Sequence, residues 1–153
     1  MELTTFSLIL TYTGMAVMLI LTCMGSALGV TMAANTTIGG LKKNPDMFGS
    51  GLVLCALPST QGLYGFAAFF LTLQRLQALN NAVTFGQGLS ILAVGIALGL
   101  VGYFSCLKQT SIVSNGIVEI SNGQDVFGKT LILAVFPELY AILAFAAAFL
   151  ALP

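Results

Sequence analysis

Residues 126–152 read VFGKTLILAVFPELYAILAFAAAFLAL, and after Lys129 their only charged residue is Glu138. The apolar stretch that surrounds this glutamate exceeds the ~20 residues that a helix needs to cross the hydrocarbon core of a bilayer. The segment therefore predicts a transmembrane helix with one carboxylate inside the membrane.

The same pattern occurs a second time, 79 residues earlier in the chain. Residues 47–73 read MFGSGLVLCALPSTQGLYGFAAFFLTL, and 11 of these 27 positions are identical in residues 126–152. The identities include Pro58 with Pro137, whereas chance similarity between two apolar helices would mostly match leucine and alanine. We therefore predict a duplicated helical hairpin, because internal repeats of this kind decide an architecture.

The composition of the whole chain is that of a membrane protein. Hydrophobic residues make up 58% and charged residues 7% of the sequence, whereas about 25% of a soluble domain is charged. Apart from Glu138, four stretches lack charge: residues 3–41, 47–74, 76–107 and 130–153. We predict an all-α membrane protein with four transmembrane helices in a single domain, residues 1–153, built from tandem hairpins at residues 1–78 and 79–153.

The distribution of basic residues predicts the orientation of these helices. Three lysines lie in the loops near residues 42–46 and 122–129, and the opposite side carries only Arg75. By the positive-inside rule both lysine loops face the cytoplasm of a cell (plasma) membrane, and both termini face outward. The net charge is zero and no basic cluster is present, so the composition excludes nucleic acid as a partner.

Glu138 is the strongest candidate for a functional residue. It follows eight uncharged residues, which places it about 12 Å inside the membrane at helical rise. A charged carboxylate at this depth costs about 2.5 to 3.5 kcal/mol, and such residues usually face partners and carry function. A bound proton or cation would remove most of this cost. The alternative role is a protonated carboxyl that donates a hydrogen bond between helices.

The other copy of the repeat supplies neutral oxygen atoms that could lie beside the Glu138 carboxylate. The position aligned with Glu138 is Ser59, so we expect one ion site per chain. Directly after Ser59, Thr60 and Gln61 lie in the middle of a transmembrane helix, and Gln109 offers a second amide. Hard oxygens suit hard cations, which favours Na⁺ over a bare proton. The same polar residues could instead form ordinary hydrogen bonds between helices.

Prolines and glycines predict how the helices bend and pack. Pro58 and Pro137 cannot donate backbone hydrogen bonds, so we expect kinks at equivalent depths of the two copies. Two GxxxG patterns, at residues 25–29 and 95–99, predict close packing of the first and third helices.

Residues 57–66, LPSTQGLYGF, and residues 138–143, ELYAIL, closely resemble the duplicated c-type proteolipids, or K subunits, of bacterial V-type (V/A-type) ATPases. The resemblance covers essentially the whole chain and points to the Na⁺-transporting branch of that family. Pro137 departs from the residue expected before the glutamate.

The resemblance implies a function and a set of ligands. Identical subunits form a rotor ring in the lipid bilayer, beside a stator membrane subunit of the a/I type with an essential arginine and below a central-stalk subunit. ATP is hydrolysed in partner subunits, so this chain has no catalytic site and no organic cofactor. The implied Na⁺ ligands, with Tyr64 hydrogen-bonded to the glutamate, are Glu138, the side chains of Thr60, Gln61 and Gln109, and the main-chain oxygen of Leu57.

Three alternatives stay open from the sequence. The first is the same rotor with H⁺ as the coupling ion. The second is a small four-helix multidrug antiporter, although such proteins place their glutamate in the first helix and do not explain the repeat. The third is a structural or pore-forming proteolipid that transports nothing.

Overall fold

The computed structural model describes residues 2–153, with side chains from Thr4 onward, and Met1 lies outside the described residues. This part of the chain forms five α-helices and two short 3₁₀ segments and contains no strand. In chain order the elements are α1 (Glu2–Leu41), η1 (Pro45–Met47), α2 (Phe48–Ala56), η2 (Leu57–Ser59), α3 (Thr60–Ala78), α4 (Phe85–Ser121) and α5 (Phe127–Ala151).

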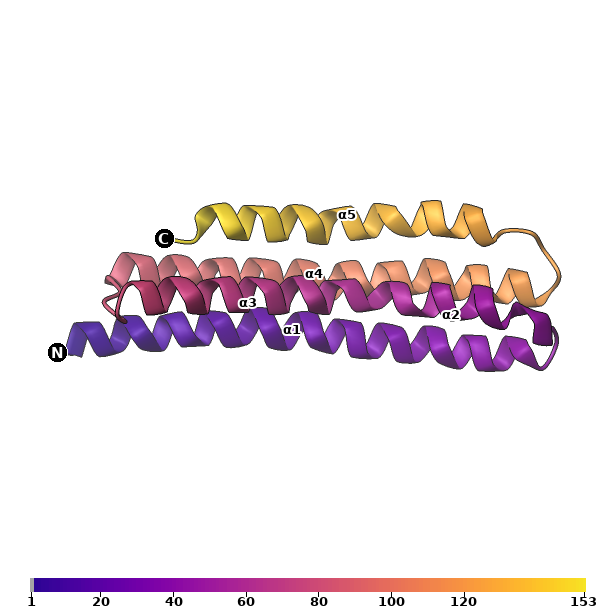
Figure 1. Ribbon diagram of the computed structural model, residues 1–153, viewed down its shortest axis with the longest axis horizontal. Coiled ribbons are helices and arrows are strands. Elements are labelled where there is room, and N and C mark those ends of the chain that lie inside the picture. The colour runs from indigo at the N-terminus through magenta and orange to yellow at the C-terminus, as the bar shows by residue number, and fades with distance from the viewer. Residues whose placement is uncertain (1) are drawn as a thin grey trace.

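Four helical stretches within the described residues are long and apolar enough to cross a membrane, which confirms the predicted fold class. The second of them, Pro45–Ala78, combines η1, α2, η2 and α3. The helices run antiparallel in one elongated bundle (Figure 1). Both chain ends and the α3–α4 turn lie at one end of this bundle, and the two lysine-containing loops lie at the other.

Local sequence signals set the helix ends at the turns. At the start of α4, Thr84 and Gln87 form a reciprocal capping box in which each side chain accepts a hydrogen bond from the backbone of the other. At its other end, Gly123 adopts a φ of +85°. The Gln124 amide then donates to the Glu119 carbonyl, which is the bond pattern that commonly closes a helix.

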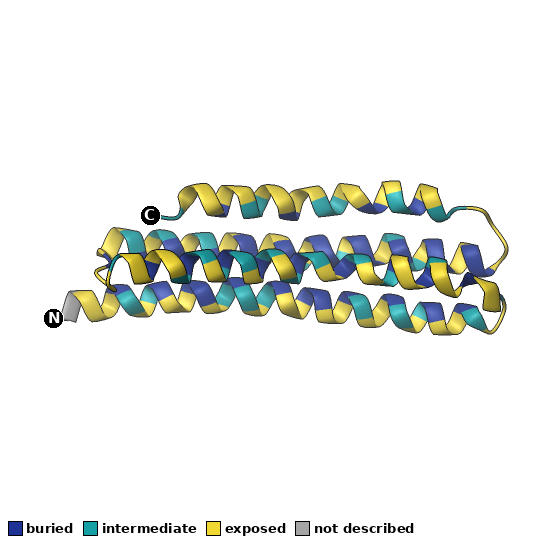
Figure 2. Ribbon diagram, viewed as in Figure 1, coloured by how far each residue is buried: buried dark blue, intermediate teal, exposed yellow. Residues whose placement is uncertain are grey.

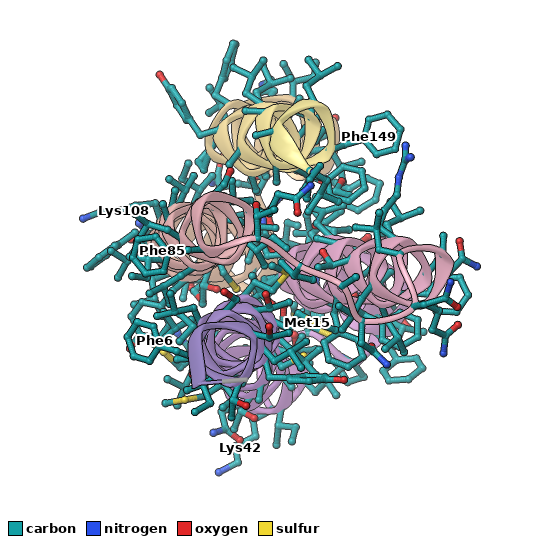
Figure 3. All side chains as sticks on the ribbon, turned by 90° about the vertical axis from the view of Figure 1, so that its left-hand side faces the viewer. Phe6, Met15, Lys42, Phe85, Lys108 and Phe149 are labelled. Atoms are coloured by element: carbon teal, nitrogen blue, oxygen red, sulfur yellow. The ribbon has the colours of Figure 1, made fainter. Side chains whose placement is uncertain are left out.

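The small-residue faces of α1 and α4 pack directly on each other, and the two helices are neighbours in the end-on view (Figure 3). A Cβ atom at Gly25 would lie 3.0 Å from the Cα atom of Tyr103. A Cβ atom at Gly95 would overlap the backbone of Gly14. The close packing that the GxxxG patterns predict is therefore present, and it occurs within one chain.

Exposed positions run along the outer faces of the helices (Figure 2), and many of them carry large apolar side chains. Exposed residues cover most of α5, and Leu150 leaves 82% of its surface uncovered. The small buried residues of α5, such as Ala134 and Ala141, face the other helices. This distribution suits a helix that has lipid on one side and protein on the other.

The three-dimensional contacts repeat with the same 79-residue spacing as the sequence. In the first hairpin, formed by α1 and α2–α3, the side chain of Thr37 packs against Gly51. In the second hairpin, formed by α4 and α5, Thr130 packs against Gly116. Each contact joins equivalent positions of the two copies, but threonine and glycine have exchanged places.

We expect Gly95→Ala to destabilise the folded protein. The added methyl group meets the backbone of Gly14, which cannot rotate away, and overpacking of this kind costs about 1–3 kcal/mol. Gly39→Ala is the matched control because nothing lies within 4 Å of its Cβ position. Thermal unfolding of the purified protein in detergent measures both variants, and equal midpoints for Gly95→Ala and the wild type would contradict the packing described here.

Candidate ion-binding site

The Glu138 carboxylate lies between α3, α4 and α5 and accepts a hydrogen bond on each oxygen. The hydroxyl of Tyr64 on α3 donates to Oε1 over 2.9 Å. The side-chain amide of Gln109 on α4 donates to Oε2 over 3.0 Å. These two bonds hold the carboxylate against two other helices. Because Glu138 is only partly buried, it still reaches the surface of the chain.

Two buried glutamines extend this network into the bundle. Gln61 and Gln109 are both 0% exposed. The Gln61 amide nitrogen donates to Gln109 Oε1 over 3.0 Å, and the Gln109 amide nitrogen also donates to the carbonyl of Ala134 over 3.0 Å. The two amides therefore connect the helix that carries Glu138 to the first hairpin.

Thr60 and Leu57 complete the chain of oxygen atoms. The Thr60 hydroxyl donates to the Leu57 carbonyl over 3.2 Å and approaches Gln61 Oε1 at 3.4 Å. The network thus runs from Leu57 through Thr60, Gln61 and Gln109 to Glu138. All six residues that the sequence singles out lie in one hydrogen-bonded cluster, in which Gln61 and Gln109 link the hydroxyl of Thr60 to the carboxylate.

The short η2 segment explains why Leu57 and Thr60 lie at this place. Pro58 has no amide hydrogen for the Leu54 carbonyl, and the amide of Leu57 donates to that carbonyl instead. The chain tightens into a 3₁₀ turn, and the Cys106 thiol donates to the Pro58 carbonyl over 3.1 Å. Partners from a neighbouring helix satisfy the backbone where the proline interrupts it.

The local structures at the two prolines differ, although the repeat predicts equivalent kinks. Pro58 interrupts the second span with η2, whereas α5 continues as an α-helix through Pro137. The hydroxyl of Ser105 donates to the Pro137 carbonyl over 2.7 Å. In both copies a side chain of α4 thus donates to the proline carbonyl, although the local structures differ.

Ser105 is the main residue of the cluster that the sequence analysis missed. Besides its bond to Pro137, it accepts a hydrogen bond from the Gln61 amide over 3.4 Å. It lies four residues before Gln109, so both side chains project from the same face of α4. That spacing is a signal from which Ser105 could have been predicted. Its equivalent in the repeat, Ser26, accepts a hydrogen bond from the Gly62 amide over 2.8 Å.

The sequence profile of the ATP synthase C-subunit family matches the chain twice, over residues 13–72 and 92–151. The chain belongs to this family. The two matched segments are offset by 79 residues (92 − 13 = 79) and each includes both helices of a hairpin, so the whole hairpin is duplicated as a unit of the C-subunit family.

Two relatives place the chain more closely within the C-subunit family. It is 35% identical over 136 residues to the V-type sodium ATPase subunit K of Enterococcus hirae, which covers 89% of this chain and 85% of that protein. It is 33% identical over 119 residues to the A-type ATP synthase subunit K of Methanocaldococcus jannaschii, which covers 78% of this chain and 50% of that protein. The chain is a rotor proteolipid of a V/A-type ATPase, a subunit that assembles into a ring.

We expect the amides of Gln61 and Gln109 to be energetically coupled. A double-mutant cycle with Gln61→Ala and Gln109→Ala should give a coupling energy of about 1 kcal/mol, the size found for hydrogen bonds between membrane helices. Unfolding of the purified protein by increasing amounts of SDS in mixed micelles provides the four free energies.

The control cycle pairs Gln61→Ala with Asn115→Ala, because Asn115 lies on the same helix as Gln109 and is exposed. That pair should be additive. Additivity of Gln61→Ala and Gln109→Ala as well would show that the two amides do not act together.

Proposed function

We propose that this rotor proteolipid carries Na⁺ as its coupling ion, bound between Glu138 and the neutral oxygens of Thr60, Gln61, Gln109 and Leu57. The observation that carries the proposal is the continuous network that joins these oxygens to a single carboxylate. A site for a proton alone needs only the carboxyl group. The sodium ATPase named among the relatives supports the same ion.

In the structure the Gln109 amide stabilises the negative charge of Glu138, and a bound cation would take over part of this role. That amide group now directs its nitrogen toward Glu138. A half-turn of the amide would present its oxygen to a cation beside the carboxylate, because the two ends of the amide group have nearly the same shape. The Gln61 amide, which now donates to the Gln109 oxygen, would have to turn with it so that a donor again faces an acceptor. Tyr64 bonds to the other carboxylate oxygen and would hold Glu138 in place during this exchange.

Charge compensation also explains how ion binding would be coupled to rotation. An ion-loaded Glu138 is nearly neutral and can face lipid, whereas the empty carboxylate costs about 2.5 to 3.5 kcal/mol in the membrane. We propose that the empty form is confined to the interface with an a/I-type stator subunit, where an essential arginine assists ion release. ATP hydrolysis, transmitted through a central-stalk subunit, would drive the ring against about 2.3 kcal/mol per ion and 100 mV.

The arrangement of loops supports the proposed orientation in a cell membrane. Lys43 in the first lysine loop donates to Asn122 at the start of the second over 3.3 Å, so both loops lie at one end of the bundle. Three lysines gather there, and the positive-inside rule assigns this end to the cytoplasm. Both termini would then face outward, and Glu138 would load and release Na⁺ between the two sides.

The proton is the alternative coupling ion for the same site. It shares the Glu138 carboxylate but gives no role to the oxygens of Thr60 and Leu57. Membership of the C-subunit family removes the multidrug antiporter as an alternative.

We expect a hydrophobic carbodiimide to label Glu138 in the purified ring, and we expect Na⁺ to prevent this labelling with a saturable dependence on its concentration. The bound cation blocks protonation of the carboxyl group, which the reagent requires. Mass spectrometry measures the labelled fraction, with choline chloride at equal ionic strength as the control. Labelling that changes with pH but not with Na⁺ would assign the proton instead.

Thr60→Val should weaken the protection by Na⁺ about tenfold, because it removes one neutral ligand worth about 1.4 kcal/mol. The matched control is Ser59→Ala. Ser59 is adjacent, carries the same functional group and donates to the Ala56 carbonyl, outside the network around Glu138. Unchanged protection in Thr60→Val would remove the threonine from the set of ligands.

A further inference from the structure

The hydroxyl group of Ser105 on α4 takes part in two hydrogen bonds of opposite direction. It donates its hydrogen to the Pro137 carbonyl over 2.7 Å and accepts one from the Gln61 side-chain amide over 3.4 Å. A hydroxyl has one hydrogen, and a carbonyl oxygen can only accept. While Ser105 donates to Pro137 it therefore offers Gln61 only lone pairs, and the amide nitrogen of Gln61 must face it.

The two glutamines pass this direction on to Glu138. The Gln61 nitrogen carries two hydrogens, of which one goes to Ser105 and the other to Gln109 Oε1 at 3.0 Å. With its oxygen turned toward Gln61, Gln109 presents its nitrogen to Glu138 Oε2 over 3.0 Å. Ser105 thus favours the arrangement in which a hydrogen-bond donor faces the empty, charged carboxylate.

An ion at this carboxylate requires the opposite direction. Tyr64 donates to Glu138 Oε1, so a cation or a proton would add on the side of Oε2 and meet the oxygen of Gln109 in place of its nitrogen. Both amides would then turn, and the Gln61 oxygen would face Ser105. The hydroxyl can satisfy that oxygen only by giving its hydrogen to it, which ends its bond to α5.

We propose that Ser105 is a positioning residue that weakens ion binding at Glu138, because its hydroxyl makes two hydrogen bonds when the site is empty and one when the site is loaded. The lost bond opposes loading and favours release. For Na⁺ this inference rests on the function proposed above, but the count of hydrogen bonds is the same for H⁺. A site that must both take up and release its ion cannot hold the ion too tightly.

The equivalent serine of the first hairpin faces a partner of fixed direction. Ser26 accepts a hydrogen bond from the backbone amide of Gly62 over 2.8 Å. A planar backbone amide cannot exchange its nitrogen and oxygen by rotation, whereas the side-chain amide of Gln61 can turn. Of the two equivalent serines, Ser105 is the one whose partner can reverse.

Ser105→Ala tests this role because it removes the hydroxyl from both states of the site. We expect Na⁺ to protect Glu138 from the carbodiimide at an about fivefold lower concentration than in the wild type, since the loss of one hydrogen bond no longer opposes loading. In choline chloride at the same pH, without Na⁺, labelling of Glu138 should be faster, because the carboxylate also takes up a proton more readily. Mass spectrometry of the purified ring measures both effects.

Two further variants serve as controls. Ser105→Thr keeps a hydroxyl group at the same position and should give wild-type values in both measurements. Ser121→Ala removes another buried hydroxyl of α4, one that donates to the Val118 carbonyl over 2.7 Å and lies outside the network around Glu138. This variant should also match the wild type.

A residue that only supported the shape of the site would weaken the protection when shortened. In rings of native size, weaker or unchanged protection by Na⁺ in Ser105→Ala would overturn the proposal, and so would the same gain in either control. If Na⁺ does not protect the wild type at all, the proposed coupling ion fails and the labelling rates without Na⁺ decide the role of Ser105. Faster labelling in Ser105→Ala would then support that role, and equal or slower labelling would overturn it.

Discussion

Lipid offers no hydrogen bonds, and the structure around the site follows from that constraint. Every polar group in the middle of the bundle must find its partner on another helix or within its own turn. The carboxylate of Glu138 draws donors from Tyr64 and Gln109, and the carbonyl of Pro58 draws the thiol of Cys106. The same bonds that satisfy these groups also hold three helices at one depth. In this protein the hydrogen bonds that stabilise the helix bundle are therefore the ones that assemble the site.

Much of this arrangement could be predicted from the sequence because the governing signals are local. The length of the apolar stretches sets the four spans, and the isolated Glu138 together with the polar face that contains Gln61 indicates where the helices meet. The role of Ser105 and the unequal behaviour of Pro58 and Pro137 could not be predicted with the same ease. Both depend on which donors a neighbouring helix presents, and one sequence does not state which helices are neighbours.

Duplication has allowed the two hairpins to take different parts in one site. The second copy supplies the charge at Glu138 and one amide at Gln109, whereas the first supplies Thr60, Gln61 and the carbonyl of Leu57. A ring with the same number of helices would carry twice as many ions if every hairpin held both the carboxylate and the neutral oxygens. The proposed division of the ligands would halve that number, and fewer ions per turn would allow each turn to work against a steeper gradient.

The exchange of threonine and glycine between the two hairpins has a consequence for how this gene can evolve. Thr37 pairs with Gly51 in one copy, and Thr130 pairs with Gly116 in the other. Recombination between the copies that joined Thr37 to Thr130 would crowd the contact, and the reciprocal product would leave an empty space between two glycines. The two helices of a hairpin would therefore be inherited as a matched pair, and gene conversion that replaced only one of them would be selected against. The duplicated halves can continue to diverge because neither can readily overwrite part of the other.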